Sequence, residues 1–161
     1  MAGSKRRWWP PSIRAVRWAA LGGIALLLLI QLVPYGHAHT NPSVTRAAKW
    51  PPGPGQQIAE AGCYDCHSNL TKWRWYSNVA PASWLVEHDV EDGRGILNFS
   101  EWNKPQPDAG ELIEKIESGE MPPLQYTLAH GSARLSSKEK KQLVAAITRL
   151  YETDPPPAGG G

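Results

Sequence analysis

The sequence predicts a small all-α domain behind a single N-terminal membrane-spanning helix. Three observations support this fold class. An apolar run at residues 18–33 follows a basic tail, several later segments repeat apolar residues every three or four positions, and no segment shows the alternation of a half-buried strand. With 161 residues, the chain has room for the anchor and one domain of about 100 residues.

The basic charge of the chain is concentrated at its N-terminus. Residues 1–17 hold no acid and five basic residues, Lys5, Arg6, Arg7, Arg14 and Arg17, whereas the rest of the chain holds 12 basic and 15 acidic residues. Because the net charge of +2 depends on this tail, it does not indicate nucleic-acid binding. Lys and Arg before an apolar run predict a cytoplasmic tail, with the following domain across the membrane.

Residues 18–36 are the predicted transmembrane anchor. The Leu-rich run at 18–33 falls between the core of a signal peptide and a full span of about 20 residues. The sequence around His37 is only a partial cleavage site, so a cleaved signal peptide remains the alternative to a retained anchor. A retained anchor predicts a single-pass membrane protein, with its domain on the side of the membrane opposite the basic tail.

Two segments rich in proline and glycine are predicted to lack regular structure. Residues 37–55 are expected to be an extended linker, with His37 and His39 in a solvated loop. Residues 153–161 end in three prolines, an alanine and three glycines, and are expected to be a disordered tail.

The domain between these segments, residues 56–152, is predicted to begin with two helices. The first is short, covers residues 56–62 and leads into the motif described below. The second begins at Pro81, because proline suits the first turn of a helix, and it ends near Asp92, where two glycines follow.

Three further helices are predicted from capping signals. Asn98 and Glu101 have the spacing of a capping box and predict a short helix. Asp108 can cap a longer amphipathic helix. Ser136 and Glu139 form another capping box ahead of the last amphipathic segment.

The stretch that carries chemistry is Cys63-Tyr64-Asp65-Cys66-His67, which has the C-x-x-C-H pattern of covalent haem attachment. Two thiols three residues apart on one helical turn can each form a thioether with a vinyl group on one edge of a porphyrin. His67 then falls beneath the iron and can ligate it through a ring nitrogen. The sequence therefore predicts one haem c, attached through Cys63 and Cys66 and ligated by His67.

Other uses of this pentapeptide fit the sequence less well. A thioredoxin-like redox pair would need an alternation of strands and helices, which the sequence does not show. A zinc site needs about four protein ligands, and the motif offers three crowded together. A structural disulfide would leave His67 without a role, and the chain has no third cysteine.

Met121 is the expected ligand on the opposite side of the iron. It is the only methionine besides Met1, and two prolines follow it. Because proline disfavours helix at the preceding residue, Met121 is expected on an extended, stiff loop that can hold its sulfur over the iron. His88 and His130 are the alternative ligands, and a core-filling role is the alternative for Met121 itself.

An aromatic-rich stretch follows the motif and has two interpretations. Its rings could wall an apolar haem crevice, or they could simply pack in the core: Trp73, Trp75, Tyr76 and Trp84.

These segments together resemble the class I monohaem c-type cytochromes, and more closely the bacterial haem-binding-domain family of small anchored cytochromes. The resemblance reaches across most of residues 31–150, through 31–41, 63–69, 73–77, 80–93, 97–102, 119–122 and 130–135. Arg74 stands where the family often has proline, in a loop that holds no ligand. Similar domains also occur fused to di-haem cytochrome c peroxidase modules.

The resemblance implies a cytochrome c-like helical fold around one haem held by Cys63, Cys66 and His67, with Met121 as sixth ligand. It also implies a bacterial cytoplasmic membrane, with the haem domain on the periplasmic side. Because this methionine is available, we expect a one-electron carrier rather than an enzyme, working with a reductase, an oxidase or a peroxidase. The alternative is the haem domain of a peroxidase or gas-sensing system with a displaceable sixth ligand, in which His88 or His130 assists.

Overall fold

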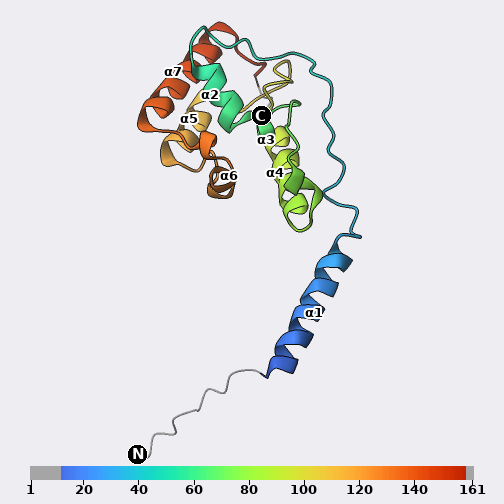
Figure 1. Ribbon diagram of the computed structural model, residues 1–161. Helices are drawn as coiled ribbons and strands as arrows, with labels where there is room; N and C mark the ends of the chain where they lie inside the picture. The colour runs from blue at the N-terminus through green and yellow to red at the C-terminus, as the bar shows by residue number, and fades with distance from the viewer. Residues whose placement is uncertain (1–11, 159–161) are drawn as a thin grey trace, which may run out of the picture.

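A computed structural model describes residues 12–158 of the chain (Figure 1). Within this range all named elements are helices: α1 (Ile13–Ile30), α2 (Gly55–Gly62), α3 (Tyr64–His67), η1 (Trp75–Asn78), α4 (Ala82–Ile96), α5 (Ala109–Ser118), α6 (Leu124–Ala129), η2 (Gly131–Ala133) and α7 (Ser137–Thr153). The two η elements are short 3-10 helices. An isolated parallel bridge joins Arg46 to Glu101, and no strand occurs in the described range. The predicted all-α class is confirmed.

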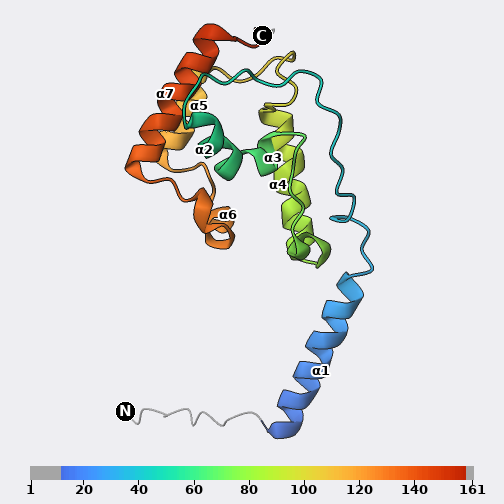
Figure 2. The same ribbon diagram turned by 45° about the horizontal axis from the view of Figure 1, so that its top comes forward.

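The helix α1 stands apart from the helical domain (Figure 1, Figure 2). It has 18 residues, a mean hydropathy of 1.8 and no buried side chain, so it is long and apolar enough to cross a membrane. At 1.5 Å per residue it is about 27 Å long, close to the thickness of a bilayer's hydrocarbon core. It begins at Ile13, earlier than the predicted start at residue 18, because Ser12 caps it through a bond from Ala15 N–H to Oγ.

Parts of the predicted tails lie outside the described residues. These are residues 1–11, with Lys5, Arg6 and Arg7, and residues 159–161. At the C-terminal end, Thr153 still belongs to α7 and Asp154 is buried, where its carbonyl accepts a bond from Trp102 Nε1 at 2.6 Å. The regular part of the domain therefore ends later than the predicted boundary at residue 152.

The segment after α1 lies against the domain. His39 Nε2 donates to the carbonyl of Ser77 at 2.7 Å, and the His39 ring stacks on Trp73 with ring centroids 4.5 Å apart. The expectation that His39 lies in a solvated loop is therefore wrong, because the ring has both an aromatic and a hydrogen-bonding partner. His37 is exposed, as expected. We call residues 39–50, which follow the surface of the domain, the strap.

The core lies where α2, α5, α7 and the turn after α4 meet. Its buried members are Ala48, Ala59, Leu97, Phe99, Trp102, Ile116, Leu143, Ile147 and Leu150. The predicted capping box at Ser136 and Glu139 starts α7, and Asp108 caps α5, as expected. Gly55 permits a close crossing of α2 and α7, because a Cβ there would lie 2.1 Å from the Cβ of Ala146.

Two local predictions are wrong. The helix α4 runs through Gly93 and Gly95 to Ile96 instead of ending near Asp92. No helix starts at Asn98 in the described structure, because the side chain of that residue is used elsewhere: its amide oxygen accepts a bond from Ser100 N–H at 2.9 Å. A stable turn replaces the predicted short helix.

Candidate functional site

The C-x-x-C-H motif borders a mostly apolar cavity of about 430 Å³. The motif and α4 form one wall, and residues of α5, α6 and the loop between them form the other. The apolar lining includes Ile96, Leu97, Phe99, Leu112, Ile116 and Pro123. Protein pockets for cofactors and other small molecules span about 300–1,000 Å³, so this cavity is of the size that a bound prosthetic group requires.

Cys63 and Cys66 both line this cavity. Cys63 ends α2 and precedes α3, and its carbonyl accepts bonds from Cys66 N–H at 3.1 Å and His67 N–H at 2.8 Å. The two thiols are free rather than joined in a disulfide. Burial raises the pKa of each thiol to about 12, the reverse of the lowered pKa that characterises a redox-active C-x-x-C pair.

Two backbone carbonyls orient the ring of His67. Its Nδ1 lies 2.9 Å from the carbonyl of Gly93 and 3.2 Å from that of Leu97, so Nδ1 carries the proton and donates it to these oxygens. Histidines that ligate metals usually donate their other ring N–H in this way, which fixes the tautomer. Burial lowers the pKa of His67, which favours the neutral ring. Nε2 is therefore the nitrogen available to a metal.

Gly93 allows α4 to lie directly on the motif. A Cβ at this position would be 2.6 Å from the carbonyl oxygen of Cys66 and 3.0 Å from its Cβ. The same closeness brings the carbonyl of Gly93 to His67. The glycine that was expected to end α4 thus serves the packing of α4 against the motif.

Replacing Gly93 with alanine should separate α3 from α4. We expect Gly93→Ala to lower the free energy of unfolding by about 1–3 kcal/mol, the usual cost of overpacking, and to lower the haem content of the purified protein. Gly95→Ala is the matched control, since it lies in the same helix and a Cβ there would meet nothing within 4 Å. Helix propensity alone would stabilise that control by up to about 1 kcal/mol. Equal denaturant midpoints for the two variants would contradict the claim that Gly93 must lack a side chain beside Cys66.

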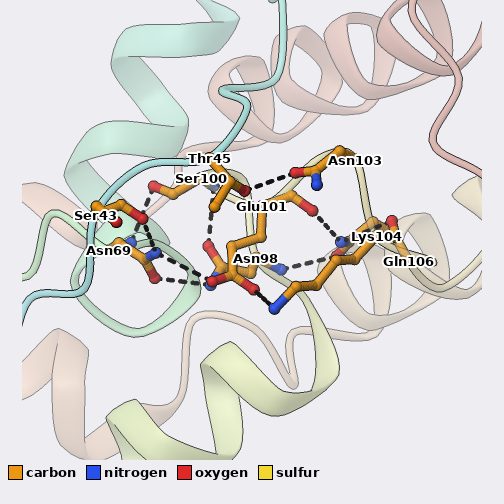
Figure 3. A network of polar contacts seen from close by, with 9 residues as sticks. All are labelled: Ser43, Thr45, Asn69, Asn98, Ser100, Glu101, Asn103, Lys104 and Gln106. Carbon is orange, nitrogen blue, oxygen red and sulfur yellow. Dashed lines mark hydrogen bonds and ion pairs between the residues drawn. The ribbon is translucent and has the colours of Figure 1, made fainter.

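A polar network with Asn69, Asn98 and Ser100 buried at its centre joins the chain after the motif to the turn after α4 (Figure 3). After the motif, Asn69 N–H donates to Ser100 Oγ at 3.0 Å, and Asn98 Nδ2 donates to Asn69 Oδ1 at 2.8 Å. Phe99 N–H donates to the carbonyl of His67 at 2.9 Å. Further bonds tie the network to the strap and to the loop before α5, through Ser43, Thr45, Asn103 and Gln106. These bonds hold the turn that directly follows Leu97, one of the two residues whose carbonyls orient His67.

Met121 lines the same cavity as the motif. It follows the left-handed turn at Gly119, where φ is 82°, and its N–H donates to the carbonyl of Lys115 at 3.0 Å. Its side chain is partly open to solvent, with 38% of the residue exposed. The structure thus brings together around one cavity all four side chains that the sequence selected: Cys63, Cys66, His67 and Met121.

The two alternative histidines lie elsewhere. His88 is exposed on α4 and pairs with Asp92, with Nε2 and Oδ2 3.3 Å apart. His130 Nδ1 donates to the carbonyl of Tyr126 at 3.1 Å, so its Nε2 accepts the bond from Tyr76 Oη at 2.8 Å. Neither histidine is among the residues that line the cavity.

The aromatic lining differs from the expected one. None of Trp73, Trp75, Tyr76 and Trp84 borders the cavity, whereas Phe99 and Tyr126 do. Tyr126 Oη donates to Oδ2 of Asp65, inside the motif, at 2.8 Å. Sequence reasoning missed Tyr126 because α6 was not predicted. Phe99 is the single phenylalanine of the chain, which is a weak signal for a special position.

This arrangement fits a haem. Two thiols border one side of an apolar cavity, a histidine of fixed tautomer lies beside them, and a thioether sulfur reaches the same space. A comparison with protein families agrees, because the model of the haem-binding domain matches residues 25–149. The chain belongs to the haem-binding-domain family. Haem binding is therefore the property that the family and the cavity share.

One curated relative of this haem-binding-domain protein is cytochrome c peroxidase Ccp of Escherichia coli (strain K12). The two are 25% identical over 100 residues, which cover 57% of this chain and 22% of the relative. The chain thus spans about a fifth of the length of that protein. No solved structure matches the chain.

Proposed function

We propose that this haem-binding-domain protein is a membrane-anchored monohaem c-type cytochrome that carries single electrons. The observation that supports the proposal most is the convergence of Cys63, Cys66, His67 and Met121 on one apolar cavity. A bound haem would supply one-electron exchange between the ferric and ferrous states of its iron.

Each of these side chains has a definite role in the proposal. The thiols of Cys63 and Cys66 would add across the two vinyl groups and hold the cofactor covalently. His67 would offer Nε2 to the iron, because Nδ1 is bound to the carbonyls of Gly93 and Leu97. Met121 would offer its sulfur to the same iron, and a methionine ligand raises the reduction potential. Keeping both ligands in both redox states favours fast electron exchange over substrate binding.

The partner of such a carrier would be another redox protein, such as a peroxidase, a reductase or an oxidase. A second function has its own support in the similarity to a cytochrome c peroxidase and in the partial exposure of Met121. In that case Met121 would leave the iron and open it to peroxide or a gas. The carrier is favoured because neither His88 nor His130, the groups that could assist such chemistry, lines the cavity.

Rapid mixing of the reduced full-length protein separates these functions. A carrier should be oxidised quickly by a soluble c-type cytochrome, bind carbon monoxide only slowly and consume no peroxide catalytically. Fast carbon monoxide binding together with peroxide turnover would instead support the peroxidase or sensor. A denatured sample, in which ligands on the iron are released, serves as the control for carbon monoxide binding.

The anchored topology has a separate test. An alkaline phosphatase reporter fused after Gly161 should be active, whereas a reporter that works only in the cytoplasm should be silent there. The charge bias of the first 17 residues and the length of α1 are the physical reasons. Release of the protein from membranes by salt, with a mature N-terminus at His39, would show a cleaved signal peptide instead.

A further inference from the structure

The end of α1 is bound directly to the haem domain. The side chain of Gln31, the residue after α1, makes two hydrogen bonds with the backbone of Ala80. Gln31 Nε2 donates to the carbonyl of Ala80 at 3.0 Å, and the N–H of Ala80 donates to Gln31 Oε1 at 2.9 Å. Four residues further on, Tyr35 Oη donates to Glu91 Oε2 at 3.1 Å. The junction of η1 and α4 therefore lies where α1 would leave a membrane.

Large apolar side chains are exposed around this junction. Beside α1 these are Leu32 and Val33, and on the domain they are Val79 and Trp75, of which Trp75 is 78% exposed. Trp75 begins the 3-10 helix η1, which ends at Asn78, two residues before Ala80, so Trp75 is close in the chain to the residue that Gln31 binds. Such a tryptophan is typical of the boundary between lipid and water.

The helix α6 extends the same surface. His130, the residue after α6, is joined to η1 by the bond between Tyr76 Oη and His130 Nε2, and Leu124 and Leu128 on α6 are 70% and 65% exposed. In both views α6 and the first turns of α4 lie on the side of the domain that faces α1, whereas the C-terminal end of α7 lies on the opposite side (Figure 1, Figure 2). We call this surface the basal face: Leu32, Val33, Trp75, Val79, Leu124 and Leu128.

The two domain segments of the basal face carry basic charge, whereas exposed acids of α4 lie beside the junction, where Glu91 accepts the bond from Tyr35. These segments, residues 70–86 and 121–134, contain the exposed basic residues Lys72, Arg74 and Arg134 and no aspartate or glutamate. This contrasts with the chain after residue 17, in which acids outnumber bases. Exposed apolar side chains flanked by Lys and Arg suit the surface of a bilayer that contains anionic lipid.

From these contacts we infer that the basal face rests in the lipid–water interface, so that the haem domain lies on the membrane at a fixed orientation instead of swinging on a tether. This contact brings the α6 wall of the haem cavity, with Pro123 and Tyr126, close to the bilayer surface. The inference rests on the proposed anchoring by α1 and adds a second contact with the same membrane.

Photo-crosslinking of the full-length protein in nanodiscs of phosphatidylcholine and phosphatidylglycerol tests whether the basal face contacts lipid. The photoreactive residue p-benzoylphenylalanine replaces Leu27 in α1, Trp75 in η1, Leu128 in α6, or Glu152, an exposed residue near the far end of α7. After irradiation, mass spectrometry measures lipid adducts. We expect labelling at Trp75 and Leu128 several-fold above that at Glu152, and strong labelling at Leu27.

The probe at Leu27 in α1 distinguishes failure of the proposed docking of the basal face from failure of the proposed membrane anchor. Labelling at Leu27 with only the Glu152 level at Trp75 and Leu128 would overturn the inference and leave the anchor intact. Labelling at Leu27 no stronger than at Glu152 would contradict the anchor, and the inference would fall with it. Because Trp75 and Leu128 are exposed, neither replacement should disturb the fold, and retained haem absorbance confirms this for each variant.

Discussion

Replacing Cys63 and Cys66 together with alanine should abolish covalent haem attachment completely. These are the only thiols in the chain, and both border the cavity. A histidine and a methionine can ligate iron, but neither can bond to the porphyrin edge, so any haem in this variant should be removed by acid–acetone extraction. Haem staining after denaturing electrophoresis measures the loss directly.

The single variants and Met121→Ala are the controls for this result. Cys63→Ala and Cys66→Ala should each retain one thioether, and Met121→Ala should retain both, so all three should keep haem on the gel. Extraction of free haem from the wild-type protein would contradict the proposed c-type attachment. Haem binding by the family would then have to be non-covalent in this chain.

Replacing Met121 with alanine should open the iron while leaving the haem attached. The variant should lose its low-spin spectrum, show a lower reduction potential and bind carbon monoxide or cyanide readily, because Met121 is the only methionine among the residues that the structure describes. Absorption spectra with and without carbon monoxide, and a redox titration, measure these changes. The fold should persist, since Met121 is partly exposed and its bond to Lys115 is made by the backbone, which the substitution keeps.

The two histidines give matched controls for this variant. His88→Ala should leave both spectrum and stability nearly unchanged, because His88 is exposed and paired only with Asp92 at the surface. His130→Ala should also leave the spectrum unchanged, but it removes the partner of Tyr76 and should cost about 0.5–1.5 kcal/mol of stability. A change of spin state in either histidine variant, with none in Met121→Ala, would reverse the ligand assignment.

The parts of the fold that depend on local chemistry could be predicted from the sequence. The caps at Asp108 and Ser136 need only neighbouring residues, and both are present. The end of α4 could not be predicted in this way. Gly93 reads locally as a helix stop, but the helix continues because the missing Cβ is needed beside Cys66, a distant residue in the chain.

The candidate site was predictable to a similar degree. The C-x-x-C-H spacing and the single internal methionine select residues whose chemistry is specific, and the structure places them around one cavity. Tyr126 and the docking of His39 on Trp73 were missed. Both depend on contacts between segments far apart in the sequence, and neither has a local spacing that would reveal it.

The absorption spectrum of the purified, oxidised full-length protein tests the central claim most directly. A thioether sulfur bound to ferric haem iron gives a weak charge-transfer band at the red end of the visible spectrum. The proposed coordination by His67 and Met121 predicts this band in a low-spin protein, and its loss in Met121→Ala. A high-spin spectrum without the band would contradict the proposal of a six-coordinate electron carrier.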